Sequence, residues 1–467
     1  MIIANSVSTH VSKSYLKTLF SLMLGLLYFY SAHSQHTMSL QQAIDSALKN
    51  NLQVKQSRLG EKLSELNVKS SKLALFPTLN ANTGLNFSFG RNQDPYSFEF
   101  YNTQIASSFG TISTSVPLFQ TSQKLKQISL DKLVFDSNKS TTRKVENDLS
   151  IQVISVYFQI LYNQDLLKAS IQQLELATRM LEQEQKQFEV GNKTLVDISQ
   201  SKAQVAVAKL NVSNIENQLN SSNLALAQLM EKDSDFIFKV ISPSVDDLEA
   251  LDIKYSASEV FDKAVQRYPS VDAARYQVLA SAKNVEITRL SLLPVLSVQA
   301  SVGTGYSSTR LRPVTNNTNS LQYVKAPFGY QIKDNLNQFV GLNLSIPLFN
   351  ASVSRIAVAK SKIALQEKQL AEKMEANNLK KIINQGIVDL KAAQSRYLST
   401  KSTYEASYIS FYAIEQRYRA GLVNSISLNQ AQTLMNLAEF ELIKAKYELI
   451  FKKKIINFYM GEPMSFD

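Results

Sequence analysis

The sequence predicts a mainly helical protein with a smaller β part, in which one structural unit occurs twice. The first observation is a pair of matching segments, V-P-L-F-Q at 116–120 and I-P-L-F-N at 346–350, which each open a long helical pattern. The second is that the patterns end after equal distances, in F-E-V-G at 188–191 and Y-R-A-G at 418–421. Equal lengths indicate two matched rods, each roughly 100 Å long.

The third observation is the scarcity of helix breakers. No proline occurs between Leu118 and Ser242 or between Leu348 and Glu462, and Gly191 is the only glycine of the first stretch. Proline breaks helix interiors and glycine weakens them. Each stretch therefore predicts very long helices joined by one turn.

The composition excludes several kinds of active site. The chain has no cysteine and only three histidines, His10, His33 and His36. Thiol nucleophiles, Cys/His zinc sites and Ser–His pairs are therefore not expected. We expect no enzyme, no cofactor and no bound metal. A hydrolase built on two carboxylates is the remaining catalytic alternative, but nothing sets one pair apart from the charges on the helices.

Residues 1–34 are typical of a secretory signal peptide. Lys13 and Lys17 precede an apolar run, Leu19 to Tyr30, and small or polar residues follow up to Ser34. The run is shorter than the roughly 20 residues that span a bilayer. The net charge is +11, but basic residues are interspersed with acidic residues along the helices. Export makes nucleic acid an unexpected partner, and contact with lipid headgroups or a solvated helix face is favoured.

Residues 35–232 form the first predicted repeat. Apolar residues at helical spacing predict a helix from Ser39 to Leu75. From Leu79 to Gly90 the period changes to two, which predicts a strand with one apolar and one small-polar face. A loop is expected from Arg91 to about Ser108, followed by a return strand that ends at Pro117.

The first long helix follows, and the chain returns with Ile198, Val205, Val212 and Leu219 at intervals of seven. This period is typical of supercoiled helix pairs. Residues 233–256 are expected to form a connector.

Residues 257–467 form the second predicted repeat. Val260–Val265 matches Ala43–Leu48, and strand alternation recurs from Leu296 to Tyr306 and from Val340 to Ile346. In the returning helix, Leu428, Met435, Leu442 and Leu449 match the first four heptad positions of the earlier one. Gly303 and Gly305 lie inside the strand pattern with no helix start after them, which disfavours a phosphate-binding loop.

Each repeat supplies two amphipathic strands, so one chain offers four. Small membrane barrels need about eight. In an exported chain, strands with one apolar face and aromatic flanking loops predict that several chains pool their strands into a barrel and their helices into a tube.

The sequence resembles the TolC family of outer membrane efflux proteins. The resemblance rests on the signal peptide, P-T-L at 77–79, both V/I-P-L-F turns and both F/Y-x-x-G tips. It implies a homotrimer in the outer membrane lipid, with a 12-stranded transmembrane barrel and a periplasmic tunnel of coiled-coil helices. It also implies a periplasmic adaptor and an inner-membrane pump of the RND or ABC type, serving drug efflux or type I secretion in a Gram-negative cell.

The turns at the helical tips carry the expected site. Glycine permits the chain reversal at Gly191 and Gly421. A plain helix-hairpin turn is one interpretation, and an apolar docking surface for the adaptor is the other. The residues expected at this surface are Phe188, Val190, Gly191, Leu195, Tyr418, Gly421, Leu422 and Val423.

The resemblance also implies a gate at the tunnel end, in which Asp197 and Tyr418 form a phenol–carboxylate hydrogen bond between neighbouring hairpins. Two departures from the family pattern are expected to matter. Ser427 and Gln430 stand where some members carry carboxylates, and Val423 stands where an arginine occurs.

The alternative to a duct is an exported periplasmic coiled-coil scaffold or adaptor without a membrane barrel. The sequence does not select the exported substrate or the pump.

Overall fold

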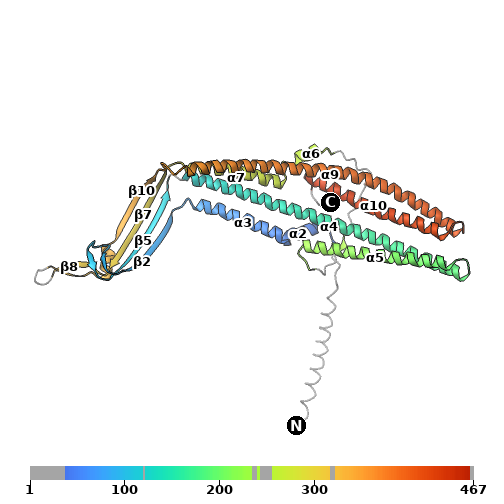
Figure 1. The fold of residues 1–467 in the computed structure, drawn as a ribbon, viewed down its shortest axis with the longest axis horizontal. Helices are drawn as coiled ribbons and strands as arrows, with labels where there is room; N and C mark the ends of the chain where they lie inside the picture. Colours follow the sequence, from blue (N-terminus) through green and yellow to red (C-terminus); the bar gives the residue numbers. More distant parts are fainter. Residues whose placement is uncertain (1–36, 119–120, 234–238, 242–254, 316–320, 463–467) are drawn as a thin grey trace, which may run out of the picture.

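The computed structural model describes residues 37–118, 121–233, 239–241, 255–315 and 321–462 (Figure 1). The predicted signal peptide and most of the predicted connector lie outside these residues. The helices are α2 (Leu40–Asn50), α3 (Leu52–Leu73), α4 (Thr121–Glu189), α5 (Leu195–Leu229), α6 (Ala257–Ala264), α7 (Pro269–Leu290), α8 (Phe328–Asp334), α9 (Val353–Arg419) and α10 (Ser425–Met460). The strands are β1 (Thr37–Met38), β2 (Thr78–Ser88), β3 (Arg91–Gln93), β4 (Phe100–Asn102), β5 (Ile105–Pro117), β6 (Lys239–Val240), β7 (Val295–Ser307), β8 (Leu311–Thr315), β9 (Leu321–Lys325) and β10 (Asn337–Ser345).

Two matched rods dominate the shape. Helices α4 and α9 contain 69 and 67 residues, which corresponds to roughly 100 Å each. Each reverses at a tip and pairs with a shorter helix, α5 or α10, while α3 and α7 lie beside the other halves of the rods. The main sheet lies at one end of the molecule and the two tips lie at the other (Figure 1).

The helix predicted from Ser39 to Leu75 is interrupted, so this prediction was wrong in detail. Asn51 has extended backbone angles and separates α2 from α3. Its side-chain oxygen accepts hydrogen bonds from the N–H groups of Gln53 and Val54, and its amide nitrogen donates to the Leu229 carbonyl at 3.2 Å. Asparagine is a favoured N-cap because it satisfies such free N–H groups, and here it also ties the break to α5.

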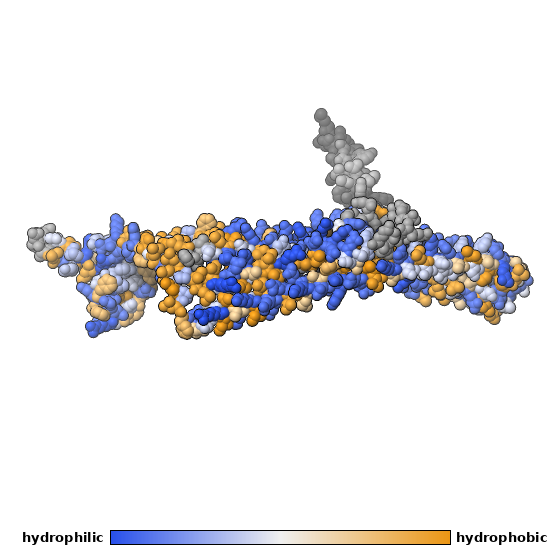
Figure 2. Space-filling model, turned by 90° about the horizontal axis from the view of Figure 1, so that it is seen from above, coloured by the Kyte–Doolittle hydropathy of each residue, from blue (hydrophilic) through white to orange (hydrophobic). Residues whose placement is uncertain are grey.

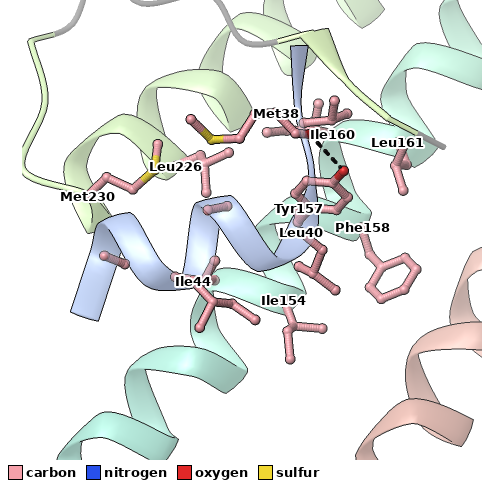
Figure 3. Packing of buried hydrophobic residues seen from close by; sticks show 14 of the residues in the cluster. Met38, Leu40, Ile44, Ile154, Tyr157, Phe158, Ile160, Leu161, Leu226 and Met230 are labelled. Atoms are coloured by element: carbon pink, nitrogen blue, oxygen red, sulfur yellow. Dashed lines mark hydrogen bonds between the residues drawn. The ribbon is translucent and has the colours of Figure 1, made fainter. Parts of the chain in front are cut away.

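One hydrophobic core lies around α2, near the middle of the rods. Leu40 and Ile44 of α2 pack against Ile154 and Ile160 of α4 and against Leu226 of α5 (Figure 3). Burial raises the pKa of Tyr157 to about 12. Its hydroxyl lies 3.0 Å from the Met38 carbonyl oxygen and accepts a hydrogen bond from the Ile241 N–H at 3.1 Å. A single phenol thus joins α4 to β1 and to residue 241 after β6.

A second core occupies the equivalent place in the other half. It contains Val260 and Ala264 of α6, which match Ala43 and Ala47 of α2. Four buried residues of α9 also correspond in sequence position to four buried residues of α4. The α9 residues are Leu379, Ile383, Ile387 and Leu390, and their α4 counterparts are, in the same order, Leu149, Val153, Tyr157 and Ile160. The same positions of both halves are therefore buried.

The main sheet has the order β10-β7-β5-β2, and every neighbouring pair is antiparallel. Strand β5 begins at Ile105, inside the segment predicted as a loop, and that segment also contains the β3–β4 hairpin. Ser107 and Ser108 lack the alternation that marks a strand, yet they pair with β2 on one side and β7 on the other. Hydrogen-bonded pairing on both sides holds these two residues in a strand although their local sequence only weakly favours one.

Exposed apolar side chains alternate along the outer strands of this sheet. Leu79, Leu85 and Phe87 of β2 and Val340, Leu342 and Leu344 of β10 are all more than half exposed. Apolar residues gather toward the sheet end of the face in Figure 2 and reappear at the tip, whereas hydrophilic residues are dense over the middle. Among the described helices, none combines the length and the apolar composition that crossing a bilayer requires.

Candidate functional site at the helical tips

Both tips use the same helix-ending turn. At the first tip the Asn192 N–H donates to the Gln187 carbonyl at 2.8 Å, and Gly191 N–H donates to the Phe188 carbonyl at 2.9 Å. At the second tip the Leu422 and Gly421 N–H groups donate to the Arg417 and Tyr418 carbonyls, each at 2.9 Å. These are Schellman motifs, which place one residue in the left-handed region.

Gly191 and Gly421 occupy that left-handed position, with φ of 78° and 75°. A Cβ atom on either residue would meet no neighbouring atom within 4 Å. The glycines are therefore required by backbone conformation and not by lack of space.

The returning helices begin with side-chain caps. Thr194 caps α5, and the Asp197 carboxylate reaches back to accept from the Thr194 N–H at 3.0 Å and the Thr194 hydroxyl at 2.7 Å. Asn424 caps α10 by accepting from the Ser427 N–H and hydroxyl at 3.0 and 2.9 Å. Since caps fix where each helix starts, they also fix which residues project from the tip.

Large apolar side chains project from these turns into solvent. Val190, Leu195 and Leu422 are each about 70 % exposed, and Phe188 is 42 % exposed. Val196, which the sequence reasoning missed, is also exposed. Val423 is half-buried. The two turns thus present a set of apolar residues whose burial against a partner would be favourable.

A buried carboxylate joins the two hairpins just behind the tips. Glu184 of α4 is only 5 % exposed. It accepts a hydrogen bond from the Tyr418 hydroxyl of α9 at 2.5 Å and another from the Ser201 hydroxyl of α5. Burial, and then the bond to Glu184, raises the pKa of Tyr418. The Lys193 ammonium lies 4.5 Å from the centre of the Tyr418 ring.

A second carboxylate contact lies closer to the tip. The Ser425 hydroxyl at the start of α10 donates to Asp197 Oδ1 at 2.7 Å. Hydroxyl donation by Ser425, and then by Thr194, lowers the pKa of the Asp197 carboxyl to about 2. Asp197 therefore stays ionised and keeps its acceptors available at any physiological pH.

The predicted gate residues lie at this junction, but within one chain each has a different partner. Tyr418 donates to Glu184, and Asp197 accepts from Ser425. Sequence reasoning missed Glu184, Ser201 and Ser425. A signal for Glu184 exists, because it lies seven residues after buried Ala177 and so falls on the inward-facing heptad position of α4.

Comparison with known proteins agrees with this architecture. The model of the family described as outer membrane efflux protein matches residues 43–231 and 260–453. The outer membrane protein TolC of Salmonella enteritidis is 21 % identical over 96 % of this chain and 86 % of its own length. The alkaline protease secretion protein AprF of Pseudomonas aeruginosa is 22 % identical over 68 % of this chain and 62 % of its own length. The crystal structure of the outer membrane protein VceC of Vibrio cholerae superposes with a TM-score of 0.75 at 14 % identity, covering 91 % of this chain and 97 % of that one.

Proposed function

Because the chain belongs to the outer membrane efflux protein family, we propose that three copies of it form one exit duct, which a periplasmic adaptor opens and an inner-membrane pump supplies. The protein is an outer membrane channel with a helical tunnel in the periplasm, and its family consists of channels and not of enzymes. We further propose that residues 35–232 and 257–467 are two repeats, joined by a connector at 233–256.

The open sheet is the single observation that carries the proposal of a barrel shared between copies. Strands β2 and β10 form its edges, and in the described chain neither has an outer neighbour. A bilayer offers no water to satisfy the free backbone groups of an edge strand, so only a closed barrel is stable there. Pairing β10 of one copy with β2 of the next removes every edge, and three copies close a 12-stranded barrel.

The tips support docking of an adaptor. Val190, Leu195 and Leu422 are exposed and belong to the turns that join α4 to α5 and α9 to α10. These turns lie at the opposite end of the described rods from the main sheet (Figure 1). Burying three such side chains contributes several kcal/mol, at about 1.5–3 kcal/mol for each. An apolar partner surface at the far end of the tunnel is the occupant that this geometry favours.

The carboxylates behind the tips support a gate. Tyr418–Glu184 and Ser425–Asp197 both join the first hairpin to the second, so separation of the hairpins breaks both bonds. Tyr418 and Asp197 keep the role proposed from the sequence, and Glu184 joins them as the buried acceptor.

Membrane fractionation tests the duct. The expected product is an outer-membrane oligomer of three 52.3 kDa chains that needs detergent for extraction and dissociates on heating. A water-soluble monomer in the periplasm would instead support a scaffold or adaptor.

Leu195→Glu tests docking separately. We expect it to abolish export and co-purification of the adaptor while trimers stay in the membrane. Gln172→Glu, which adds the same charge at an exposed position of α4 away from the tip, is the matched control and should export normally.

A further inference from the structure

The strand register assigns every residue of the main sheet to one of two faces. Asn80, Asn82 and Asn86 of β2 share one face with Gly84, and polar amides of this kind do not face hydrocarbon. This face is therefore the wall of the lumen, and Leu79, Leu85 and Phe87 lie on the lipid side.

Two phenylalanines lie on the lumen face. Phe109 of β5 pairs directly with Gly84 on β2 and with Gly305 on β7, so it shares their face. Phe339 of β10 pairs with Ser301 of β7, two strand positions from Gly303. They are 40 % and 57 % exposed. The lumen is polar and filled with water, so lipid contact does not explain why apolar rings are exposed at these two separate positions on its wall.

Each ring lies against a glycine. A Cβ atom on Gly84 would lie 2.5 Å from Phe109 Cε1, and one on Gly341 would lie 2.6 Å from Phe339 Cζ. Any larger residue would displace the rings from the wall. The glycines thus allow both rings to lie along the strands, with a face available to the lumen.

A third ring comes from the loop after β2. A Cβ atom on Gly305 would overlap the Tyr96 hydroxyl, which donates to the Ser108 carbonyl at 3.1 Å. Fully buried Asp94 holds this loop by accepting from the Tyr96 N–H at 2.9 Å and from the Ser307 hydroxyl. Since Gly305 is the direct partner of Phe109, the phenol hydroxyl and the phenyl ring lie on the same face and at the same level of the sheet.

The rest of the wall is uncharged. On the lumen face of the four described strands, the other side chains are Ser, Thr, Asn and Gln, apart from Ile105, Pro117 and Val295 at the strand ends. A wall without charge neither attracts nor excludes ions strongly. Hydroxyl and amide groups beside an aromatic face suit a solute that has both a planar ring and polar substituents.

We propose that Phe109 with Tyr96, and Phe339 at a separate position on the same wall, are aromatic stacking positions in the barrel lumen that bind planar aromatic solutes as they leave the duct. This proposal rests on the proposed function and names a cargo class for it. Aromatic rings attract one another beyond the contribution of buried area, and flat rings on a wall admit a second ring without narrowing the lumen greatly. Three copies repeat the site around the barrel.

The test uses the purified chain in lipid nanodiscs, with saturation-transfer difference NMR as the binding measurement and empty nanodiscs subtracted. The probes are N-acetylphenylalaninamide and N-acetylcyclohexylalaninamide, which share size and lack of charge and differ in aromaticity. We expect the aromatic probe to bind about fivefold more tightly, the factor that corresponds to a stacking contribution of about 1 kcal/mol. Equal binding of the two probes would overturn the proposal.

The double variant Phe109→Leu/Phe339→Leu tests the assigned residues while keeping apolar volume over the glycines. We expect it to remove the fivefold preference. Phe87→Leu, on the lipid side of the same sheet, is the control, and we expect it to keep the preference for the aromatic probe. If the double variant fails to assemble, Phe339→Leu alone replaces it, and we expect this single variant to weaken the preference for the aromatic probe.

Conductance across planar bilayers separates the two proposals. Absence of pores from the wild-type chain would refute the duct itself. Wild-type pores with no preference for the aromatic probe, or a preference that survives in the double variant, would refute only the aromatic site.

Discussion

Replacing Glu184 by alanine should open the tunnel end. In the structure this carboxylate accepts the Tyr418 hydroxyl across the hairpin junction and the Ser201 hydroxyl within its own hairpin. Only the Tyr418 bond is broken when the hairpins separate, so it alone changes the closed–open equilibrium. A hydrogen bond to a charged group contributes about 1.5–3 kcal/mol, which corresponds to roughly a 10- to 150-fold larger open population for each chain.

Single-channel conductance in planar bilayers measures this population. Glu184→Gln should have a smaller effect of about 1 kcal/mol, because the amide oxygen still accepts from Tyr418 but carries no charge. The matched control is Glu182→Ala, which removes an exposed carboxylate from the same helix turn. Equal open fractions in Glu184→Ala, Glu182→Ala and the wild type would refute a gating role for Glu184.

Three further predictions follow from other parts of the molecule. The folded-state pKa of Asp197 is lowered from 3.8 to about 2, so its contribution to tip closure is complete above about pH 4 and is lost as the pH falls toward 2. Conductance measured from pH 7 to pH 2 should therefore rise between pH 4 and pH 2. Asp197→Asn should remove this pH dependence. Gly421→Val should destabilise the tip turn by about 1–2 kcal/mol, because φ is 75° there and a side chain is strained in the left-handed region. Export should fall while trimers remain in the membrane, and normal export would contradict a functional tip. Leu342→Arg, on the lipid side of β10, should destabilise the barrel by about 2–4 kcal/mol near the bilayer midplane, seen as a lower dissociation temperature of the trimer, whereas Asn343→Arg on the lumen side should leave that temperature nearly unchanged.

The sequence by itself determined the elements that depend on neighbouring residues. Alternation from Leu79 onward predicted β2, the absence of proline predicted α4 and α9, and the glycines at 191 and 421 predicted the two reversals. These features are local, since a strand or a helix face is set by residues two to seven positions apart. The shared motifs of the two halves also led to the family before any contact was known.

Only the tertiary structure decided which distant groups meet. Asn51 ends α2 where its amide reaches Leu229, and Glu184 accepts from a tyrosine 234 positions later in the chain. Alternation along β5 gives the face of Phe109, but only the strand register places it between Gly84 and Gly305. Such contacts depend on the register between strands and on the packing between helices, and these are fixed when the whole chain folds, because the free energy that selects them comes from burial of residues far apart in sequence.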